Sequence, residues 1–283
     1  MPSLKEIKAR IASINNTKKI TSAMKMVSAA KLHHAQAAIE NGRPYERGLK
    51  AILTHLLDAG AEPDSPYLAA RTPRRVVIVA FSSNSGLCGT FNANVERSFF
   101  QRVRAYEEQS IETLLYPVGK KIAESAAKQG YAAEGDFQHL LNRPSYQEVS
   151  AWAERLADLF ISGRADRVEL LYHHFKSAGS QVLTWDTWLP IPFDGANGGE
   201  RAANYIIEPS ADRLLAELLP KVLRLHLYTV LLDTIASEHA ARVLAMQTAS
   251  ENANDLLQEL TLQYNKSRQQ AITNELLDIM GGG

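Results

Sequence analysis

The sequence predicts an α/β protein in which the N- and C-terminal segments form a long antiparallel two-helix coiled coil around an inserted domain. From Lys221 to Met280 the chain contains neither glycine nor proline, and a helical segment with the same apolar spacing opens the chain. Between these segments, short β-branched runs alternate with amphipathic stretches, as in α/β domains. A helix at each end of a different middle predicts that the ends pair.

The C-terminal segment repeats apolar residues every 3.5 positions, which is the spacing of a coiled-coil seam. At about 1.5 Å per residue, a helix from Lys221 to Met280 would be roughly 90 Å long. The predicted seam includes Leu232, Val243, Met246, Leu257 and Leu260. A lone helix cannot bury such a stripe, so most of its stability has to come from a partner helix. The alternative is one long helix inside an ordinary bundle.

The N-terminal segment carries a matching pattern. Ser3 and Glu6 have the spacing of a capping box at the start of a helix. With one shift of register after Ile14, the predicted seam runs through Ile7, Ile11, Ile14, Ile20, Met24, Val27, Ala30 and Ala37. Gly42 and Pro44 are expected to kink or end this helix, and a second apolar pattern continues to Leu57.

The pattern in the middle of the chain predicts a Rossmann-like α/β domain. Four strands are predicted, at Arg75–Phe81, Ile111–Val118, Arg167–Phe175 and Gln181–Ile191. Helical patterns separate the first three strands, which favours a parallel sheet, whereas the last two strands form a hairpin at one edge. The predicted organisation is a helix over 1–57, a linker over 58–73, the α/β domain over 74–206 and the C-terminal helix over 207–283.

Composition limits the kinds of partner. The chain has 283 residues and a formal net charge of zero, so the whole molecule shows no electrostatic preference for nucleic acid or membrane. Residues 1–39 are strongly basic, with Glu6 as their only acidic side chain before Glu40. This stretch is either one of two complementary solvated faces or a basic helix that moves past an acidic partner. Aromatic residues are absent from residues 1–44, which disfavours a nucleic-acid interface.

Cysteine content and hydropathy indicate the compartment. Cys88 is the only cysteine, so the chain has no internal disulfide, which suits a reducing environment. No run of eighteen apolar residues is present, and the N-terminus lacks the apolar core of a signal peptide. We therefore expect a bacterial cytoplasmic protein.

The loop after the first predicted strand is where an α/β enzyme would place its chemistry. It contains Gly86, Leu87, Cys88 and Gly89, and the strand–glycine loop–helix order is the context of a phosphate site. However, the spacing differs from GxGxxG and no Gly-Lys-Ser/Thr follows. We expect the glycines to serve a tight turn, Cys88 to be a buried thiol rather than a nucleophile, and no cofactor to bind this chain.

The histidines give no metal site by their spacing. His33–His34 and His173–His174 are adjacent pairs, and neighbouring side chains on one helix or strand point in different directions. No acid–base pair or catalytic triad stands out.

Four segments resemble the γ subunits of bacterial F-type ATP synthases. They are KEIKARIASINNTKKITSAMKMVSAAKL, SGLCGTFNANV, SEHAARVLAMQTASENANDLL and LQYNKSRQQAITNELLDI. The match follows the family order and covers nearly the whole chain. The resemblance implies a non-catalytic rotor shaft that couples rotation of the membrane c-ring to conformational changes at catalytic β subunits.

The resemblance also implies partners, location and contact residues. It implies one copy per complex, contacts with α, β and ε subunits and the c-ring, ATP, ADP and magnesium held by the α and β subunits, and a peripheral place on the cytoplasmic face of the inner membrane. It assigns β-subunit contacts to Met24, Lys25, Arg268, Gln269 and Thr273. The chain departs from the family at its Gly281–Gly283 end, where related chains continue with small apolar residues. It also departs at Asn84, near a common aspartate-arginine step.

Two other functions are compatible with parts of the sequence. The first is a nucleotide-dependent enzyme that uses the α/β domain, with the helices as a dimerisation arm. The second is a coiled-coil scaffold without a rotary role. Nucleotide binding by the full chain would favour the first, and co-purification of α and β subunits separates the rotor from the second.

Overall fold

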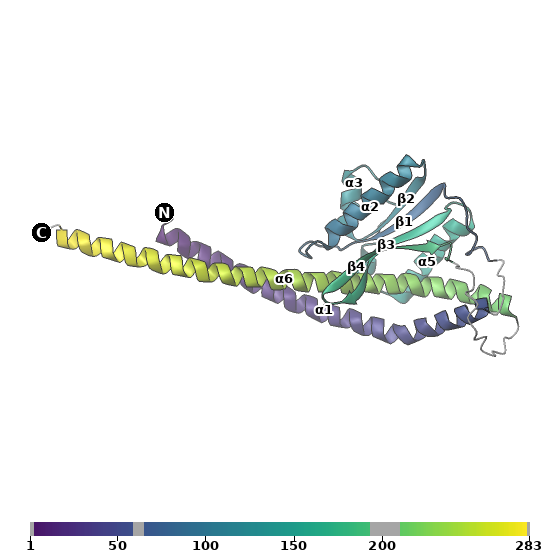
Figure 1. The fold of residues 1–283 in the computed structure, drawn as a ribbon, viewed down its shortest axis with the longest axis horizontal. Helices are drawn as coiled ribbons and strands as arrows, with labels where there is room; N and C mark the ends of the chain where they lie inside the picture. Colours follow the sequence, from purple (N-terminus) through teal and green to yellow (C-terminus); the bar gives the residue numbers. More distant parts are fainter. Residues whose placement is uncertain (1–2, 59–64, 193–209, 282–283) are drawn as a thin grey trace. The chain divides into compact units, whose positions relative to one another are not determined.

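The computed structural model describes residues 3–58, 65–192 and 210–281. In chain order its elements are α1 (Leu4–Asp58), β1 (Arg75–Phe81), α2 (Phe91–Glu108), β2 (Glu112–Val118), α3 (Lys120–Lys128), α4 (His139–Asn142), α5 (Tyr146–Ile161), β3 (Arg167–Ser177), β4 (Ser180–Leu189) and α6 (Ala211–Gly281) (Figure 1). A long helix at each end and a mixed sheet between them confirm the predicted fold class. The short helix α4 was not predicted.

The chain forms two compact units, and the boundary between them crosses both long helices. One unit joins residues 1–30 to residues 242–283, and the other comprises residues 31–241. These limits differ from the sequence-based divisions at 57, 73 and 206, which follow changes of pattern rather than contacts. None of the described helices contains a stretch apolar enough to span a membrane.

The sheet of the larger unit has the strand order β2-β1-β3-β4. β1 pairs in parallel with β2 and with β3, whereas β3 and β4 form an antiparallel hairpin. Parallel strands need crossover connections, which the helices between β1, β2 and β3 supply. The predicted parallel sheet with an edge hairpin is therefore confirmed.

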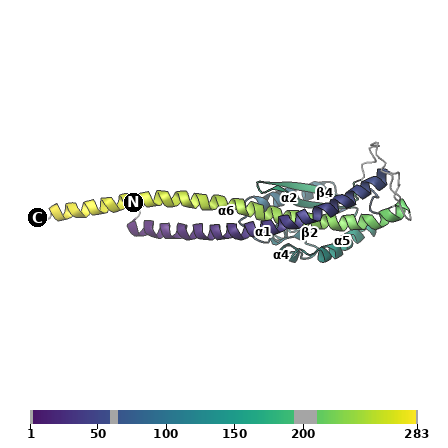
Figure 2. The same ribbon diagram turned by 90° about the horizontal axis from the view of Figure 1, so that it is seen from below.

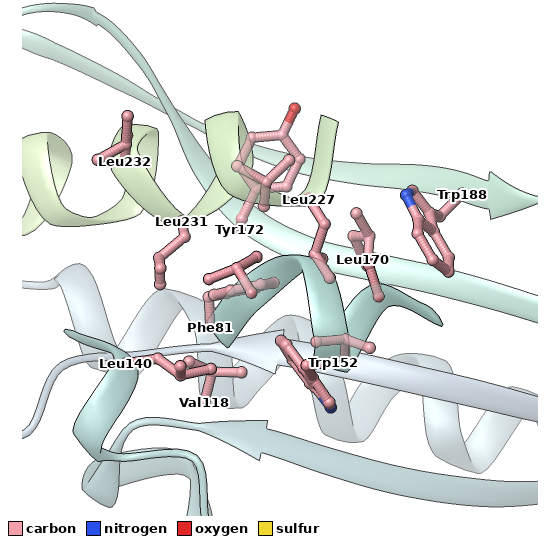
Figure 3. Packing of buried hydrophobic residues seen from close by; sticks show 14 of the residues in the cluster. Phe81, Val118, Leu140, Trp152, Leu170, Tyr172, Trp188, Leu227, Leu231 and Leu232 are labelled. Atoms are coloured by element: carbon pink, nitrogen blue, oxygen red, sulfur yellow. The ribbon is translucent and has the colours of Figure 1, made fainter. Parts of the chain in front are cut away.

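Alternating residues of β1 face two different cores. Val76, Ile78 and Ala80 pack with α2 and α3, whereas Val77, Val79 and Phe81 pack with α5, α6 and part of α1. Figure 3 shows the second core, in which Phe81, Trp152 and Leu231 come from β1, α5 and α6. A parallel strand buried on both faces explains why RVVIVAF is apolar throughout.

Helix α6 is covered on every side over residues 230–238, within the larger unit. All residues from 230 to 238 are buried, and Leu232 belongs to the core that includes the sheet. Leu232 is thus a core residue of the larger unit, in a cluster to which α1 also contributes Leu32, Ala35 and Ile39, and its assignment to the seam stays a prediction. The hairpin is also attached to α6 by polar contacts, since Trp188 Nε1 donates to the Leu223 carbonyl at 3.2 Å.

Helix α1 does not end at Gly42 or Pro44. It runs to Asp58 with Pro44 inside it, so an end at these residues is wrong, whereas the alternative of a kink stays a prediction. Pro44 is exposed, and apolar contacts hold the helix on both sides of it. Ile39 lies in the sheet-side core, and Leu49 packs with Leu218 and other leucines of α6. Tertiary packing therefore outweighs the lost backbone hydrogen bond.

The start of α1 has the predicted capping box. The Ser3 amide donates to the Glu6 carboxylate at 2.8 Å, and the Glu6 amide donates to Ser3 Oγ at 3.3 Å. The two side chains thereby satisfy amide groups that have no partner within the helix.

In the smaller unit, the seam of α1 keeps one register throughout. Buried or half-buried residues follow the three-four spacing without a break at Leu4, Ile7, Ile11, Ile14, Lys18, Thr21, Lys25 and Ser28, and Ser22 and Met24 beside them are also half-buried. The predicted register shift is wrong, because Ile20 is 60% exposed and Val27 is 59% exposed. On α6 the matching positions are Val243, Met246, Ser250, Ala253, Leu257 and Leu260, of which Met246, Ala253 and Leu260 are buried.

Breaking this seam should be costly. Ala253 is 8% exposed in the interior of α6, so Ala253→Pro removes a backbone hydrogen bond and introduces a clash, with an expected cost of about 3 kcal/mol or more. The matched control is Glu275→Pro, in a stretch where every residue is exposed. Thermal unfolding followed by circular dichroism should show a lower midpoint for Ala253→Pro alone. Equal midpoints for the two variants would contradict a stabilising seam.

Candidate functional site

Lys25 lies against α6, and its neighbour Met24 is not fully exposed to solvent. Both are half-buried, and the Lys25 ammonium group donates to Gln247 Oε1. Gln247 in turn donates to the Glu251 carboxylate. Their assignment as partner contacts stays a prediction, and the structure adds that Lys25 also connects the two helices.

Arg268, Gln269 and Thr273 lie beyond the end of the seam. From residue 268 to residue 281 every described position of α6 is exposed, and both views show this end continuing past the beginning of α1 (Figures 1 and 2). The Thr273 hydroxyl donates to the Gln269 carbonyl one turn earlier, at 2.9 Å. The Arg268 and Gln269 side chains therefore stand on a bare helix, where planar multi-donor groups can bind carboxylates or carbonyls of a partner.

Large apolar side chains are exposed along both helices of the smaller unit. On α1 they are Ile20, Met26 and Val27, and on α6 they are Leu244, Leu262, Ile272, Leu276, Leu277, Ile279 and Met280. Met280 is 82% exposed. Exposed apolar clusters of this kind mark surfaces that bind other proteins.

The loop after β1 caps helix α3. The first-turn amides of α3 need acceptors from outside the helix. Lys120 N donates to Asn84 Oδ1 at 3.0 Å, Lys121 N to the Ser83 carbonyl at 3.1 Å and Ile122 N to Ser82 Oγ at 3.0 Å. The polar groups of this loop thus serve the fold, as expected of a tight structural turn.

Cys88 is enclosed in the same loop. It is 1% exposed, and Asn92 Nδ2 lies 3.2 Å from its Sγ atom while also donating to Ser83 Oγ at 2.8 Å. Leu87 has φ 63° and Gly89 has φ 60°, which gives the turn its shape. Leu87 is 65% exposed, so the loop presents one apolar side chain on a backbone held by internal hydrogen bonds.

The histidine pair on β3 divides into one buried and one exposed ring. His173 is 3% exposed, stacks on Phe91 with ring centroids 4.3 Å apart, and has no hydrogen-bond partner for Nδ1 among the described residues. Burial lowers the pKa of its imidazole from 6.5 to about 4. His174 Nδ1 instead lies 2.5 Å from Asp233 Oδ2 of α6, and burial raises the pKa of that carboxyl group.

The predicted contact residues Met24, Lys25, Arg268, Gln269 and Thr273 are half-buried or exposed on helices, which suits binding by surface contact. Within the described ranges, no group of three His, Cys, Asp or Glu side chains has the arrangement of a metal site. Polar contacts between the long helices, such as that of Lys18 with Asn254, were not predicted from the sequence. A signal was present, because the three-four spacing from Leu4 to Ser28 is unbroken once polar residues are allowed in the seam.

Comparison with known proteins identifies a family. A protein-family model described as "ATP synthase" matches residues 3–283. The chain is 59% identical to the ATP synthase gamma chain of Phocaeicola vulgatus, covering 100% of this chain and 99% of that protein. It is 56% identical to the gamma chain of Parabacteroides distasonis, covering 100% and 98%.

Solved structures share the fold. A chain of the Euglena gracilis mitochondrial ATP synthase, in a structure of its OSCP, F1 and c-ring parts, matches with a TM-score of 0.69 and 21% identity over 99% of this chain and 93% of that chain. A rotor chain of the same enzyme matches with a TM-score of 0.67 and 20% identity, over 95% and 98%. The long-helix architecture is thus retained at low identity.

Two glycines near the loop after β1 should respond differently to alanine. At Gly119, with φ +112°, a Cβ atom would lie 2.4 Å from the Ser82 carbonyl oxygen. Gly119→Ala should therefore cost about 2–6 kcal/mol through backbone strain and overlap. Gly86→Ala meets no atom within 4 Å and should change stability by less than about 1 kcal/mol. Urea unfolding measures both, and a severe effect at Gly86 would contradict the structural role given to this loop.

Stability should fall on acidification because His173 is buried as the neutral imidazole. Its folded pKa of about 4 lies below the ordinary 6.5, so between these values the unfolded state binds more protons. The stabilising contribution is complete above pH 6.5 and decreases as pH falls toward 4, by about 2 kcal/mol between pH 7 and pH 5.

The variant His173→Phe should remove this part of the pH dependence. His34→Gln, at an exposed histidine, is the matched control and should keep it. Chemical unfolding of the three proteins at pH 7 and pH 5 measures the difference. The assignment would be wrong if His173→Phe and wild type lost the same stability.

Proposed function

The chain belongs to the ATP synthase family, as a relative of its gamma chains, and we propose that it is the central rotor shaft of a bacterial F-type ATP synthase. The family model spans residues 3–283, and the curated relatives are matched over their whole length. In this role the chain is a non-catalytic subunit that couples rotation of a c-ring to conformational changes at catalytic β subunits.

The exposed end of α6 carries this proposal. Residues 268–281 form helix without any buried residue, although a helix of this length without a packed face is only marginally stable in water. Several of its exposed side chains are apolar, including Ile272, Leu276 and Ile279. Such an end suits a surrounding protein surface that contacts it on several sides, as a ring of α and β subunits would.

The basic face of α1 supports an acidic partner. Lys5, Lys8, Arg10, Lys19 and Lys31 are exposed, and Glu6 is the only acidic residue before Glu40. Opposite charges on the two partners stabilise contacts that form and break as the shaft rotates. They also disfavour binding to wrong partners. An acidic segment of the β subunit is the partner that we propose for this face.

The mechanism rests on contacts that differ among three identical catalytic sites. A rotor can change the state of a site only through different interaction free energies with that site's conformations. Because α6 extends beyond α1, the two helices present unequal faces to a surrounding ring. One proton crossing 100 mV releases about 2.3 kcal/mol, and the rotating shaft has to transmit this free energy without unfolding. Two helices that share a packed seam resist unfolding better than a lone helix does.

The remaining assignments belong to the same proposal. One copy per complex contacts α, β and ε subunits and the c-ring, at the cytoplasmic face of the inner membrane, as a peripheral subunit. The chain binds no cofactor, and ATP, ADP and magnesium are held by the α and β subunits. The use of loop 82–90 to cap α3 weighs against the alternative of a nucleotide-dependent enzyme.

Co-purification tests the proposal directly. The tagged full chain, expressed with the α and β subunits of its source, should form a complex that hydrolyses ATP cooperatively. A coiled-coil scaffold without a rotary role predicts that the chain purifies without them. Equilibrium dialysis of the full chain with ATP and NAD tests the enzyme alternative, which requires tight one-to-one binding.

The exposed cluster on α6 should matter for cooperative turnover. In the assembled complex, Arg268→Ala combined with Gln269→Leu removes charged and planar donors that we assign to one β subunit. Loss of partners from a desolvated charged hydrogen bond costs about 2–5 kcal/mol, so multisite ATP turnover should fall tenfold or more while assembly is retained. Steady-state hydrolysis compared with single-site turnover measures the effect.

Lys266→Ala is the matched control for this cluster. Lys266 is exposed on the same helix but is not among the assigned contacts, so multisite turnover should stay near the wild-type value. Normal multisite turnover of the double variant in an intact complex would remove the role assigned to Arg268 and Gln269.

A further inference from the structure

A belt of polar residues interrupts the apolar seam of the smaller unit. We call it the polar belt, and it consists of Lys18, Ser22 and Lys25 on α1 with Gln247, Ser250 and Asn254 on α6. Thr21 and Ser28 are buried beside it, at 8% and 3% exposure. The seam between the beginning of α1 and the belt is apolar, with Ile7, Ile11 and Ile14 on α1. Polar groups in a seam cost stability, so their concentration here calls for a physical explanation.

Three contacts across the polar belt define a single pairing of the helices. Lys18 Nζ donates to Asn254 Oδ1 at 2.8 Å, the Ser22 and Ser250 hydroxyl oxygens lie 3.2 Å apart, and Lys25 Nζ donates to Gln247 Oε1. Steps of four and three residues along α1 are matched by steps of four and three in the opposite direction along α6. All three contacts therefore belong to one antiparallel register.

The apolar parts of the seam select that register only in part. After a slip of seven residues in one direction, Leu4 and Ile7 would meet Leu260 and Leu257 in place of Ile11 and Ile14, because the seam repeats with that period. In a slipped register Ser22 would instead face Leu257 or Val243. A half-buried hydroxyl that loses its hydrogen-bond partner across the seam is unfavourable, so the polar belt disfavours both slipped registers.

We propose that the polar belt keeps the paired segments 1–30 and 242–283 in one axial register, in addition to the packing of α1 on α6 at Leu49 and Leu218, and so maintains how far α6 extends past the beginning of α1. A slip of one heptad would move the end of α6 by about 10 Å relative to α1. Ser22 and Ser250 are the discriminating pair, since each slipped register still offers one lysine an amide partner. The consequence for Arg268 and Gln269 rests on the proposed function, whereas the register itself does not.

Disulfide trapping in the full-length chain tests the register without reference to activity. In a Cys88→Ser background, Ile11→Cys is combined in separate proteins with Leu260→Cys, which reports the observed register, or with Ala253→Cys or Ser267→Cys, which report slips of one heptad. With the native belt, oxidation should give a disulfide only in the protein that combines Ile11→Cys with Leu260→Cys. Circular dichroism of each protein confirms that it is folded.

The decisive variant replaces the polar belt by apolar residues of similar size. Lys18→Met, Ser22→Ala, Lys25→Met, Gln247→Leu, Ser250→Ala and Asn254→Leu together should raise the thermal midpoint and increase the slipped disulfides tenfold or more. A second variant has only two substitutions, Ser22→Leu and Ser250→Leu, and it should also increase the slipped disulfides. Lys19→Leu, at an exposed lysine next to the belt, is the control and should form no slipped product.

Two outcomes would overturn the proposal. Disulfide formation restricted to the Ile11→Cys, Leu260→Cys protein in both folded belt variants would mean that other contacts along the chain set the register. Slipped products with the native belt would mean that the polar belt does not select one. A different result would be that the α and β subunits fail to co-purify while the Ile11→Cys, Leu260→Cys disulfide forms as expected. That result would count against the proposed function and leave the register assignment intact.

Discussion

The structure depends on how one helix, α6, covers its apolar surface along its length. From 230 to 238 it is buried on all sides by the α/β unit, from Val243 to Ser267 it shares a seam with α1, and from 268 onward it is bare. A long helix has to obtain most of its stability from packing. These three environments therefore divide the protein into an anchored part, a paired part and a part left for partners.

The α/β unit anchors this helix, and its loop after β1 contributes to the fold of the unit. The loop after β1, which in many α/β enzymes cradles phosphate, here gives its oxygens to the first amides of α3. The β3–β4 hairpin is attached to α6 through Trp188 and through the His174–Asp233 contact. A sheet attached to a helix by such contacts can transmit force to it, which fits the rotor role proposed above.

The smaller unit combines stabilising and specifying interactions in one seam. Apolar residues such as Ile7 and Leu260 supply burial but little discrimination between registers, whereas the Ser22–Ser250 contact supplies discrimination at a cost in burial. The same arrangement turns Ile20 and Val27 outward, where they add apolar surface to the basic face of α1. The face of α1 that packs on α6 therefore also determines which side chains of α1 are available to other proteins.

The sequence by itself determined the two long helices, the four strands with their edge hairpin, and the Ser3–Glu6 capping box, because periodicity and capping are local properties. It also determined family membership through long matched segments. Only the tertiary structure decided that Lys18, Lys25 and Ser28 occupy the seam, that α1 continues through Pro44, and that Leu232 lies in the core of the α/β unit. Those outcomes depend on which side chains stand opposite each position, and a residue's own sequence neighbours do not specify that.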